Sequence, residues 1–332
     1  MITTAGTQSQ GCAWLDCRAR RSLLLSARNS YWLPNVDATM PTTSTRTSTR
    51  RRFNRRRFLQ LLAGAGLALG GAAGYTRLIE PHWVEVDELT LPIPRLSPAA
   101  DGTRFVQISD IHLSEYFSPD RLSDALARVR RLAPQWVVLT GDYVGHSAES
   151  AQGLVEPLRQ LGIPVYAGFG NHDHWTDRPT VQRYLEAAGA TILLNQALAV
   201  ADDLWLAGID DVWSGRPDLA AALRDIPSRA TAVLLAHEPD YFDYLIQTDA
   251  PVTLQLSGHS HGGQVRFPQS EPDAAGHYSW APILPKHGRR YPIGLRTIGT
   301  RMVYTNRGLG VWPVPIRFNC RPEITLITLR TA

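Results

Sequence analysis

The sequence predicts an α/β catalytic domain with a largely buried sheet, covering about residues 101–332. Two observations predict this class. Short apolar runs that are rich in β-branched residues alternate with amphipathic helical patterns along this part of the chain. Hydrophobic residues make up 44% of the 332 residues and charged residues 19%, which supports a packed core and excludes disorder throughout.

The first 57 residues have the composition of a basic, disordered arm. They hold eleven arginines against two acids, which gives this segment a charge of +9. Of 34 basic and 30 acidic residues in all, 23 and 28 remain for the body, which is therefore mildly acidic. A nucleic-acid-binding protein normally carries its basic patch on the folded domain, so we expect no nucleic-acid partner. Because Met40 directly precedes a polar, basic region, we expect residues 1–39 to come from a misplaced start.

Residues 58–75 are expected to be the apolar part of an export signal or a membrane anchor. Arg56 and Arg57 stand directly before an apolar run that is rich in glycine and alanine. This order is typical of a secretory signal, and the arginine pair resembles a twin-arginine signal, which export machinery reads. The run is shorter than the ~20 residues of a full span, so both cleavage and a retained anchor stay open. In either case we expect the body on the outer side of the cytoplasmic membrane, exported or tethered.

The rest of the chain predicts a regular succession of elements. Residues 76–100 predict a proline-rich linker that contains an edge strand at 84–91. A helix is expected after Ser118, its N-cap, and Pro134 ends it. The other expected helices lie at about 148–161, 179–188, 216–225 and 239–247. The expected strands of the body lie at 105–108, 136–139, 164–167, 191–194, 204–207, 232–235, 252–256, 302–304 and 324–329.

Polar clusters follow five of these strands, at the point where each strand ends. They contain seven residues of metal-ligand type: Asp110, His112, Asp142, Asn171, His237, His259 and His261. Ligands bind beyond the carboxyl ends of strands in open α/β sheets, so these side chains are expected to converge. If the segments are extended, the first two point the same way, as do the last two. Seven ligands exceed the four of one zinc site and indicate two divalent metals (Mn, Fe or Zn) that share one carboxylate.

The ordered motifs resemble those of the calcineurin-like metallophosphoesterase superfamily. The pattern of that superfamily is D-x-H, G-D, G-N-H-[DE], H and G-H-x-H, and every block is present here in order. The longer stretches GNHDHW (170–175), AHEPD (236–240), GHSHGGQVRFP (258–268) and TNRGLG (305–310) are most similar to the bacterial branch of exported, membrane-associated phosphodiesterases, which often carry a twin-arginine signal. The resemblance implies a single domain of two packed mixed β-sheets flanked by helices.

The resemblance also implies roles for the site residues. Asp110, His112 and His261 would hold one metal, Asn171, His237 and His259 the other, and Asp142 would bridge them. His172 would be catalytic, contacting the phosphate and acting as general acid or charge stabiliser. Some relatives orient this histidine with an aspartate three residues after the bridging one, where this chain has Gly145. Asp173 is the alternative candidate for that task.

The implied function is hydrolysis of a phosphate ester by in-line attack of a metal-bound hydroxide. The export signal and residues 269–300, which carry Tyr278, Trp280, Arg289, Arg290 and Tyr291, favour a membrane surface as partner. We therefore expect a phosphodiesterase or pyrophosphatase that acts on a lipid or an envelope glycolipid, although an ordinary solvated hairpin would explain the insertion equally. An exported phosphomonoesterase or nucleotidase is the alternative. A non-catalytic binding module is disfavoured because all seven ligands and His172 are present.

Overall fold

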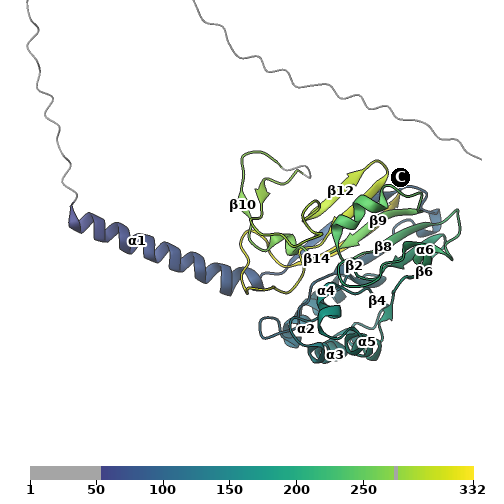
Figure 1. The fold of residues 1–332 in the computed structure, drawn as a ribbon, viewed down its shortest axis with the longest axis horizontal. Coiled ribbons are helices and arrows are strands. Elements are labelled where there is room, and N and C mark those ends of the chain that lie inside the picture. Colours follow the sequence, from purple (N-terminus) through teal and green to yellow (C-terminus); the bar gives the residue numbers. More distant parts are fainter. Residues whose placement is uncertain (1–53, 273–275) are drawn as a thin grey trace, which may run out of the picture. The chain divides into compact units, whose positions relative to one another are not determined.

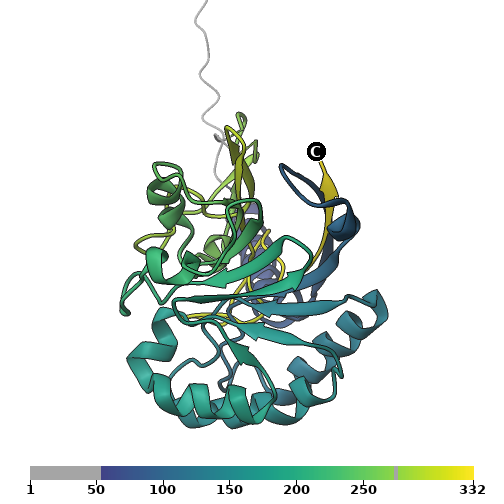
Figure 2. The same ribbon diagram turned by 90° about the vertical axis from the view of Figure 1, so that its right-hand side faces the viewer.

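The computed structural model describes residues 54–272 and 276–332, and they form two six-stranded mixed sheets (Figure 1). The predicted arm and misplaced start in residues 1–53 lie outside the described residues. The sheets pack face to face with helices on their outer faces (Figure 2), which confirms the predicted fold class.

The first sheet has the strand order β1-β14-β2-β3-β4-β5, and β2, β3, β4 and β5 run parallel. Strand β14 pairs antiparallel with β2 and parallel with β1, which forms the edge that we expected from the linker. The strands are β1 (Glu85–Ile93), β14 (Glu323–Thr331), β2 (Arg104–Ile108), β3 (Trp136–Leu139), β4 (Val165–Ala167) and β5 (Thr191–Ile192).

The second sheet has the order β12-β13-β9-β8-β7-β6, parallel in its middle and antiparallel at both edges. Its strands are β12 (Gly294–Ile298), β13 (Arg301–Thr305), β9 (Val252–Ser257), β8 (Thr231–Leu235), β7 (Leu204–Gly208) and β6 (Gln196–Ala201). A separate hairpin pairs β10 (Phe267–Pro268) with β11 (Ser279–Trp280).

Alternation along the central strands divides the core into layers. Phe105 and Val138 face the layer between the sheets, whereas Val106 and Val137 face the helices on the outer side. Strands that are buried on both faces read as uninterrupted apolar runs, and for this reason β2 and β3 are visible in the sequence. The outer faces are covered by α2 (Pro119–Leu132), α3 (Gln152–Arg159) and α5 (Arg178–Ala187) on the first sheet, and by α6 (Leu219–Leu223) and α7 (Phe242–Leu245) on the second.

Helix α2 begins and ends where the sequence predicts. The Ser118 side chain accepts a hydrogen bond from the Arg121 N–H at 3.4 Å, and Leu122 and Val129 are buried. Ala133 then adopts the left-handed conformation before Pro134. The remaining helical turns are α4 (Asn171–Thr176), η2 (Glu80–His82), η3 (Pro98–Ala100), η4 (Ala148–Ala151), η5 (Pro239–Tyr241) and η6 (His261–Gly263).

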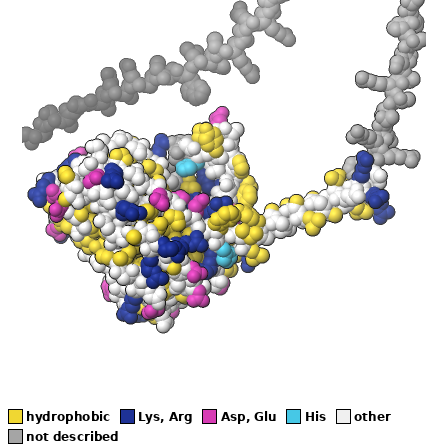
Figure 3. All heavy atoms as spheres, turned by 180° about the vertical axis from the view of Figure 1, so that it is seen from behind, with side chains coloured by type: hydrophobic (Ala, Val, Ile, Leu, Met, Phe, Trp, Pro, Cys, Tyr) yellow, Lys and Arg dark blue, Asp and Glu magenta, His cyan; other side chains and the backbone are white. Residues whose placement is uncertain are grey.

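Helix α1 (Arg55–Gly74) has no buried residue, and hydrophobic side chains are exposed along it (Figure 3). It begins at Arg55 because the Asn54 side chain accepts a hydrogen bond from the Arg56 N–H at 3.1 Å. The end of the basic arm, which we expected after residue 57, therefore falls inside this helix. The helical path continues through η1 (Tyr75–Ile79) to His82, and by length and composition it could cross a membrane, a property that secretory signals share.

Candidate dinuclear metal site

The seven predicted ligand residues and His172 come from five segments, each of which follows a strand. Among the described residues, three groups place metal-binding atoms within 4.8 Å of one another: Asp110, His112 and His261; His112, Asp142 and His172; and Asp142, His237 and His259. All of these residues are buried. The sequence therefore identified side chains that the fold brings to one place.

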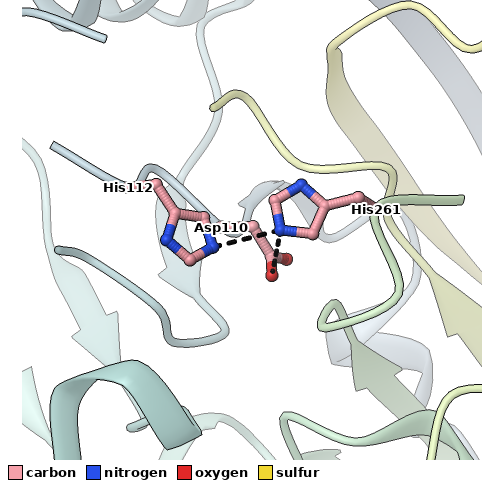
Figure 4. A group of neighbouring side chains, drawn as sticks. All are labelled: Asp110, His112 and His261. Carbon is pink, nitrogen blue, oxygen red and sulfur yellow. Dashed lines mark hydrogen bonds and ion pairs between the residues drawn. The ribbon is translucent and has the colours of Figure 1, made fainter. Parts of the chain in front are cut away.

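The first group joins the end of β2 to the end of β9 (Figure 4). The Nε2 atom of His261 lies 3.4 Å from Oδ1 of Asp110 and 3.0 Å from Nε2 of His112. The Nδ1 atom of His112 faces the Val144 carbonyl oxygen at 3.3 Å, so it carries the proton and leaves a lone pair on Nε2. Two ring nitrogens that face each other beside a carboxylate are suited to share a cation.

Asp142 lies between this first group and the remaining ligands, Asn171, His237 and His259, which we call the second group. Its Oδ2 atom is 3.5 Å from Nε2 of His112 and 3.2 Å from Nε2 of His237. In the second group the Thr140 carbonyl oxygen faces Nδ1 of His237 at 2.7 Å, which fixes that ring with Nε2 toward the site.

Asn171 and His259 complete this second group. Oδ1 of Asn171 and Nδ1 of His259 are buried and have no hydrogen-bond partner among the described residues. The Lys286 carbonyl oxygen faces the other ring nitrogen of His259 at 2.7 Å. Buried polar atoms without partners are costly, and a divalent cation between them would satisfy both. The donor set therefore fits two metals of the borderline class.

The backbone at the ligands differs from our expectation. We considered extended segments for the pairs Asp110/His112 and His259/His261, yet these four residues have φ angles of 48°, 46°, 68° and 51°, and Asp142 has a φ angle of 56°. The left-handed region is uncommon for residues other than glycine and clusters at functional sites. The side chains converge, but through left-handed turns after the strands rather than through strand alternation.

Glycines next to the ligands make room for the carboxylates. A Cβ atom on Gly258 would lie 2.1 Å from Oδ2 of Asp110, and one on Gly170 would lie 2.3 Å from Oδ1 of Asp142. No real Cβ atom makes such contacts, so both positions require glycine.

The ring of His172 is positioned by a main-chain carbonyl rather than by an aspartate. Its Nδ1 atom lies 3.1 Å from the Gly145 carbonyl oxygen, and its backbone N–H donates to Oδ1 of Asp142 at 2.8 Å. The Asp173 carboxylate instead accepts three backbone hydrogen bonds, from Asp142 at 3.0 Å, Tyr143 at 2.9 Å and Gly170 at 2.9 Å. Asp173 therefore braces two ligand-bearing loops, and our candidate role for it as the group that orients His172 is wrong.

Electrostatics leaves three imidazoles neutral. Burial lowers the pKa of His112 and of His259 to about 3, and burial lowers the pKa of His261 as well. Burial favours the protonated form of Asp142, but the neighbouring His237 and His172 hold its pKa well below the ordinary value. Neutral imidazole and ionised carboxylate are the forms that bind metals.

Three tryptophans lie next to the histidine rings of this site. Trp175 lies 4.8 Å from the His172 ring and Trp213 lies 5.7 Å from the His259 ring, measured between centroids. Trp312 was not singled out, because no polar motif marks it. Its ring lies 4.6 Å from the His172 ring and 5.6 Å from the His112 ring.

A cavity of about 390 Å³ opens from the ligands. Its floor includes His112, Asp142 and Asn171, and its walls are mostly apolar: Trp175, Trp213, Val265, Pro282, Ile283, Leu284, Pro285, Trp312, Pro313, Val314 and Ile316. The side chain of Gln264 binds both backbone groups of Trp312, accepting from its N–H at 2.8 Å and donating to its carbonyl oxygen at 2.6 Å. The wall is thus tied to the segment that carries two of the ligands.

Only some of the residues of 269–300 that we expected to face a membrane surface are exposed. Tyr278 and Trp280 are exposed, but Tyr291 is buried and packs edge-on against Phe242 at 5.4 Å. Tyr291 was wrongly placed among the expected membrane-facing residues, because its ring closes the core outside the second sheet. Arg290 is exposed and pairs with Asp243 at 2.9 Å.

Comparison with known proteins agrees with this geometry. The calcineurin-like phosphoesterase family profile matches residues 103–263. The chain is 37% identical over 295 residues to the uncharacterized metallophosphoesterase YkuE of Bacillus subtilis, covering 85% of this chain and 99% of that protein. The chain belongs to the calcineurin-like phosphoesterase family.

Two further relatives have names that state a reaction. The phosphodiesterase YaeI of Escherichia coli is 33% identical over 292 residues, covering 83% of this chain and 99% of that protein. The UDP-2,3-diacylglucosamine pyrophosphatase LpxG of Chlamydia muridarum is 26% identical over 306 residues, covering 75% of this chain and 90% of that protein. This family member is a metal-dependent phosphoester hydrolase.

Proposed function

We propose that this hydrolase is a phosphodiesterase or pyrophosphatase whose substrate is a lipid or an envelope glycolipid. The observation that carries the proposal is the apolar cavity, because its walls begin at the metal-binding side chains themselves. A phosphate at the ligands would place an attached hydrocarbon group between Leu284, Val314 and Ile316. The names of YaeI and LpxG support the same reaction class and, for LpxG, a lipid-linked pyrophosphate.

The side chains divide the work as the family resemblance implies. Asp110, His112 and His261 would hold one cation, Asn171, His237 and His259 would hold the other, and Asp142 would be shared between the two sites. When bound, the two divalent cations neutralise phosphate oxygens and lower the pKa of water. The Nδ1–H group of His172 donates a hydrogen bond to the Gly145 carbonyl oxygen. The other ring nitrogen, Nε2, is therefore the atom that donates a proton to the leaving oxygen.

Localisation is part of the same proposal. Arg56 and Arg57 stand at the start of the exposed apolar helix α1, which supports a twin-arginine signal or a tether. The body then works on the outer side of the cytoplasmic membrane, where envelope lipids are at hand.

The test compares ester classes on the full chain loaded with Mn²⁺. Bis-p-nitrophenyl phosphate is expected to turn over faster than p-nitrophenyl phosphate, and Asp142→Asn is expected to abolish both reactions. UDP-diacylglucosamine is expected to be cleaved in preference to UDP-N-acetylglucosamine, which lacks the acyl chains. Preference for the monoester would overturn the proposal in favour of an exported phosphomonoesterase or nucleotidase. Two bound metals without turnover of any ester would overturn it in favour of a binding module.

A further inference from the structure

Exposed apolar side chains lie at the cavity lining and on the β10–β11 hairpin, and we call them the apolar rim. It consists of Phe267, Tyr278, Trp280, Ile283 and Val314, which are 42%, 63%, 47%, 80% and 47% exposed. Single exposed hydrophobic residues are ordinary, but a group of five large ones, two of which line the cavity, indicates an interaction surface.

The rim is continuous with the cavity. Ile283 and Val314 line the cavity themselves, and they belong to two separate segments of its wall. Phe267 and Trp280 face each other across the β10–β11 hairpin with ring centroids 5.6 Å apart. Phe267 also contacts Phe318 at 5.9 Å, which links the hairpin to the segment that contains Val314.

The same segment meets the end of the apolar helical path. The backbone N–H of Arg317 donates to the Thr76 carbonyl oxygen at 2.9 Å. Thr76 lies in η1, two residues after the end of α1, and the helical stretch Arg55–His82 is long and apolar enough for a membrane. A chain that leaves a membrane at this point would bring the rim to the membrane surface.

The charge beside the rim fits anionic headgroups. Lys286 directly follows the wall residue Pro285, and it is the only lysine among the 34 basic residues of the chain. Its ammonium group lies 6.0 Å from the Trp213 ring centroid, and no carboxylate of the described residues pairs with it. Tryptophan, tyrosine and lysine together are typical of a protein surface at a lipid interface.

We infer that the apolar rim inserts into the interfacial layer of an anionic phospholipid bilayer, with the cavity mouth facing the lipid. Tyr278 and Trp280 lie at headgroup level, and Ile283 and Val314 reach the acyl chains. The surface is a second membrane contact, additional to α1. The membrane role of α1 and the consequence that a lipid passes from the bilayer directly into the cavity rest on the proposed function; the insertion of the rim itself does not.

The test measures the depth of single labelled positions in the full chain. Cys12 and Cys17 are replaced by serine, which leaves the buried Cys320 as the remaining thiol. An environment-sensitive fluorophore is then attached at Ile283→Cys, and, as a matched control, at Glu186→Cys. Glu186 is exposed on α5, which covers the outer face of the first sheet.

The protein is reconstituted with vesicles of phosphatidylglycerol and phosphatidylcholine that contain lipids spin-labelled on the acyl chain. We expect the label at 283 to shift to shorter wavelength and to be quenched several-fold more than the label at 186. Equal quenching at the two positions would overturn the inference. A shift that follows protein concentration without vesicles would also overturn it, because a second copy of the chain would then cover the rim.

Hydrolysis rates of rim variants distinguish a failure of this inference from a failure of the proposed function. Phe267→Asp and Trp280→Asp lie outside the cavity lining, so each is expected to hydrolyse soluble bis-p-nitrophenyl phosphate at the rate of the unmodified chain. In the labelled protein, each is expected to reduce the quenching at position 283. Unchanged quenching in both variants would count against the rim even if the diesterase activity is as proposed.

Discussion

The carboxylate of Asp173 offers the sharpest test of how the site is held together. It is fully buried, and its Oδ2 accepts from the N–H groups of Asp142 and Gly170 while its Oδ1 accepts from that of Tyr143. Asparagine has the same shape but only one accepting atom. Whichever way the amide turns, at least one buried N–H loses its acceptor and faces an NH₂ group instead.

The size of the effect follows from that count. One unsatisfied buried donor costs about 1–3 kcal/mol, so Asp173→Asn should lower the free energy of unfolding by about that amount. Because two of the three N–H groups belong to residues 142 and 143, the bridging loop should loosen and the metal content should fall. A role in orienting His172 would instead reduce turnover and leave the free energy of unfolding unchanged.

The assay is urea unfolding of the metal-free protein, combined with elemental analysis of the Mn²⁺-loaded protein. Asp177→Asn is the matched control, since Asp177 is exposed and its side chain makes no capping hydrogen bond. We expect the control to stay within about 0.5 kcal/mol of the unmodified chain. If Asp173→Asn stays within the same limit and keeps its metals, the bracing role is refuted.

Three further outcomes are expected. His172→Ala should keep both metals in elemental analysis and lose most hydrolysis, whereas Asp142→Asn should lose both; a fully active His172→Ala would contradict the assigned proton donor. Gly258→Ala should lower metal content, because its Cβ would lie 2.1 Å from Oδ2 of Asp110, and normal metal binding would show that the loop can move aside. Removal of the metals with a chelator should lower the melting temperature and stop hydrolysis, and Mn²⁺ should restore both, because a cation that binds only the folded state stabilises it; hydrolysis that persists without metal would exclude the dinuclear mechanism.

Much of the fold could be predicted because the central strands are buried on both faces. Strand β3 is an uninterrupted apolar run and was predicted with its bounds. Strands β6 and β12 were missed because they lie at sheet edges, where their residues are only partly buried and no clear alternation results. Helix α4 was missed because it begins at Asn171 itself, inside a polar motif of only a few residues that shows no helical periodicity.

The ligand residues of the candidate site could be predicted from the sequence, but the groups that position the catalytic histidine and form the wall could not. Ligand-type residues follow strands whose ends meet, and this arrangement is visible in the sequence. The group that positions His172 is a main-chain carbonyl, which every residue possesses, so nothing in the sequence marks Gly145 for that role. Trp312 was invisible for a related reason, because it contacts the histidine rings from a proline-rich segment about fifty residues beyond His261.

One short segment connects the metal-binding side chains to the apolar rim. Residues 258–267 supply His259 and His261, then Gln264, whose amide holds Trp312 through two hydrogen bonds, and finally Phe267 of the rim. Two of the metal-binding side chains, the amide that holds Trp312 of the wall, and one residue of the rim therefore belong to a single loop. Under the proposed function, the phosphate of the substrate would lie at the inner end of this loop and its apolar part toward the rim. Substitutions at Gln264 should consequently alter the preference between acylated and non-acylated substrates more than the rate on a small diester.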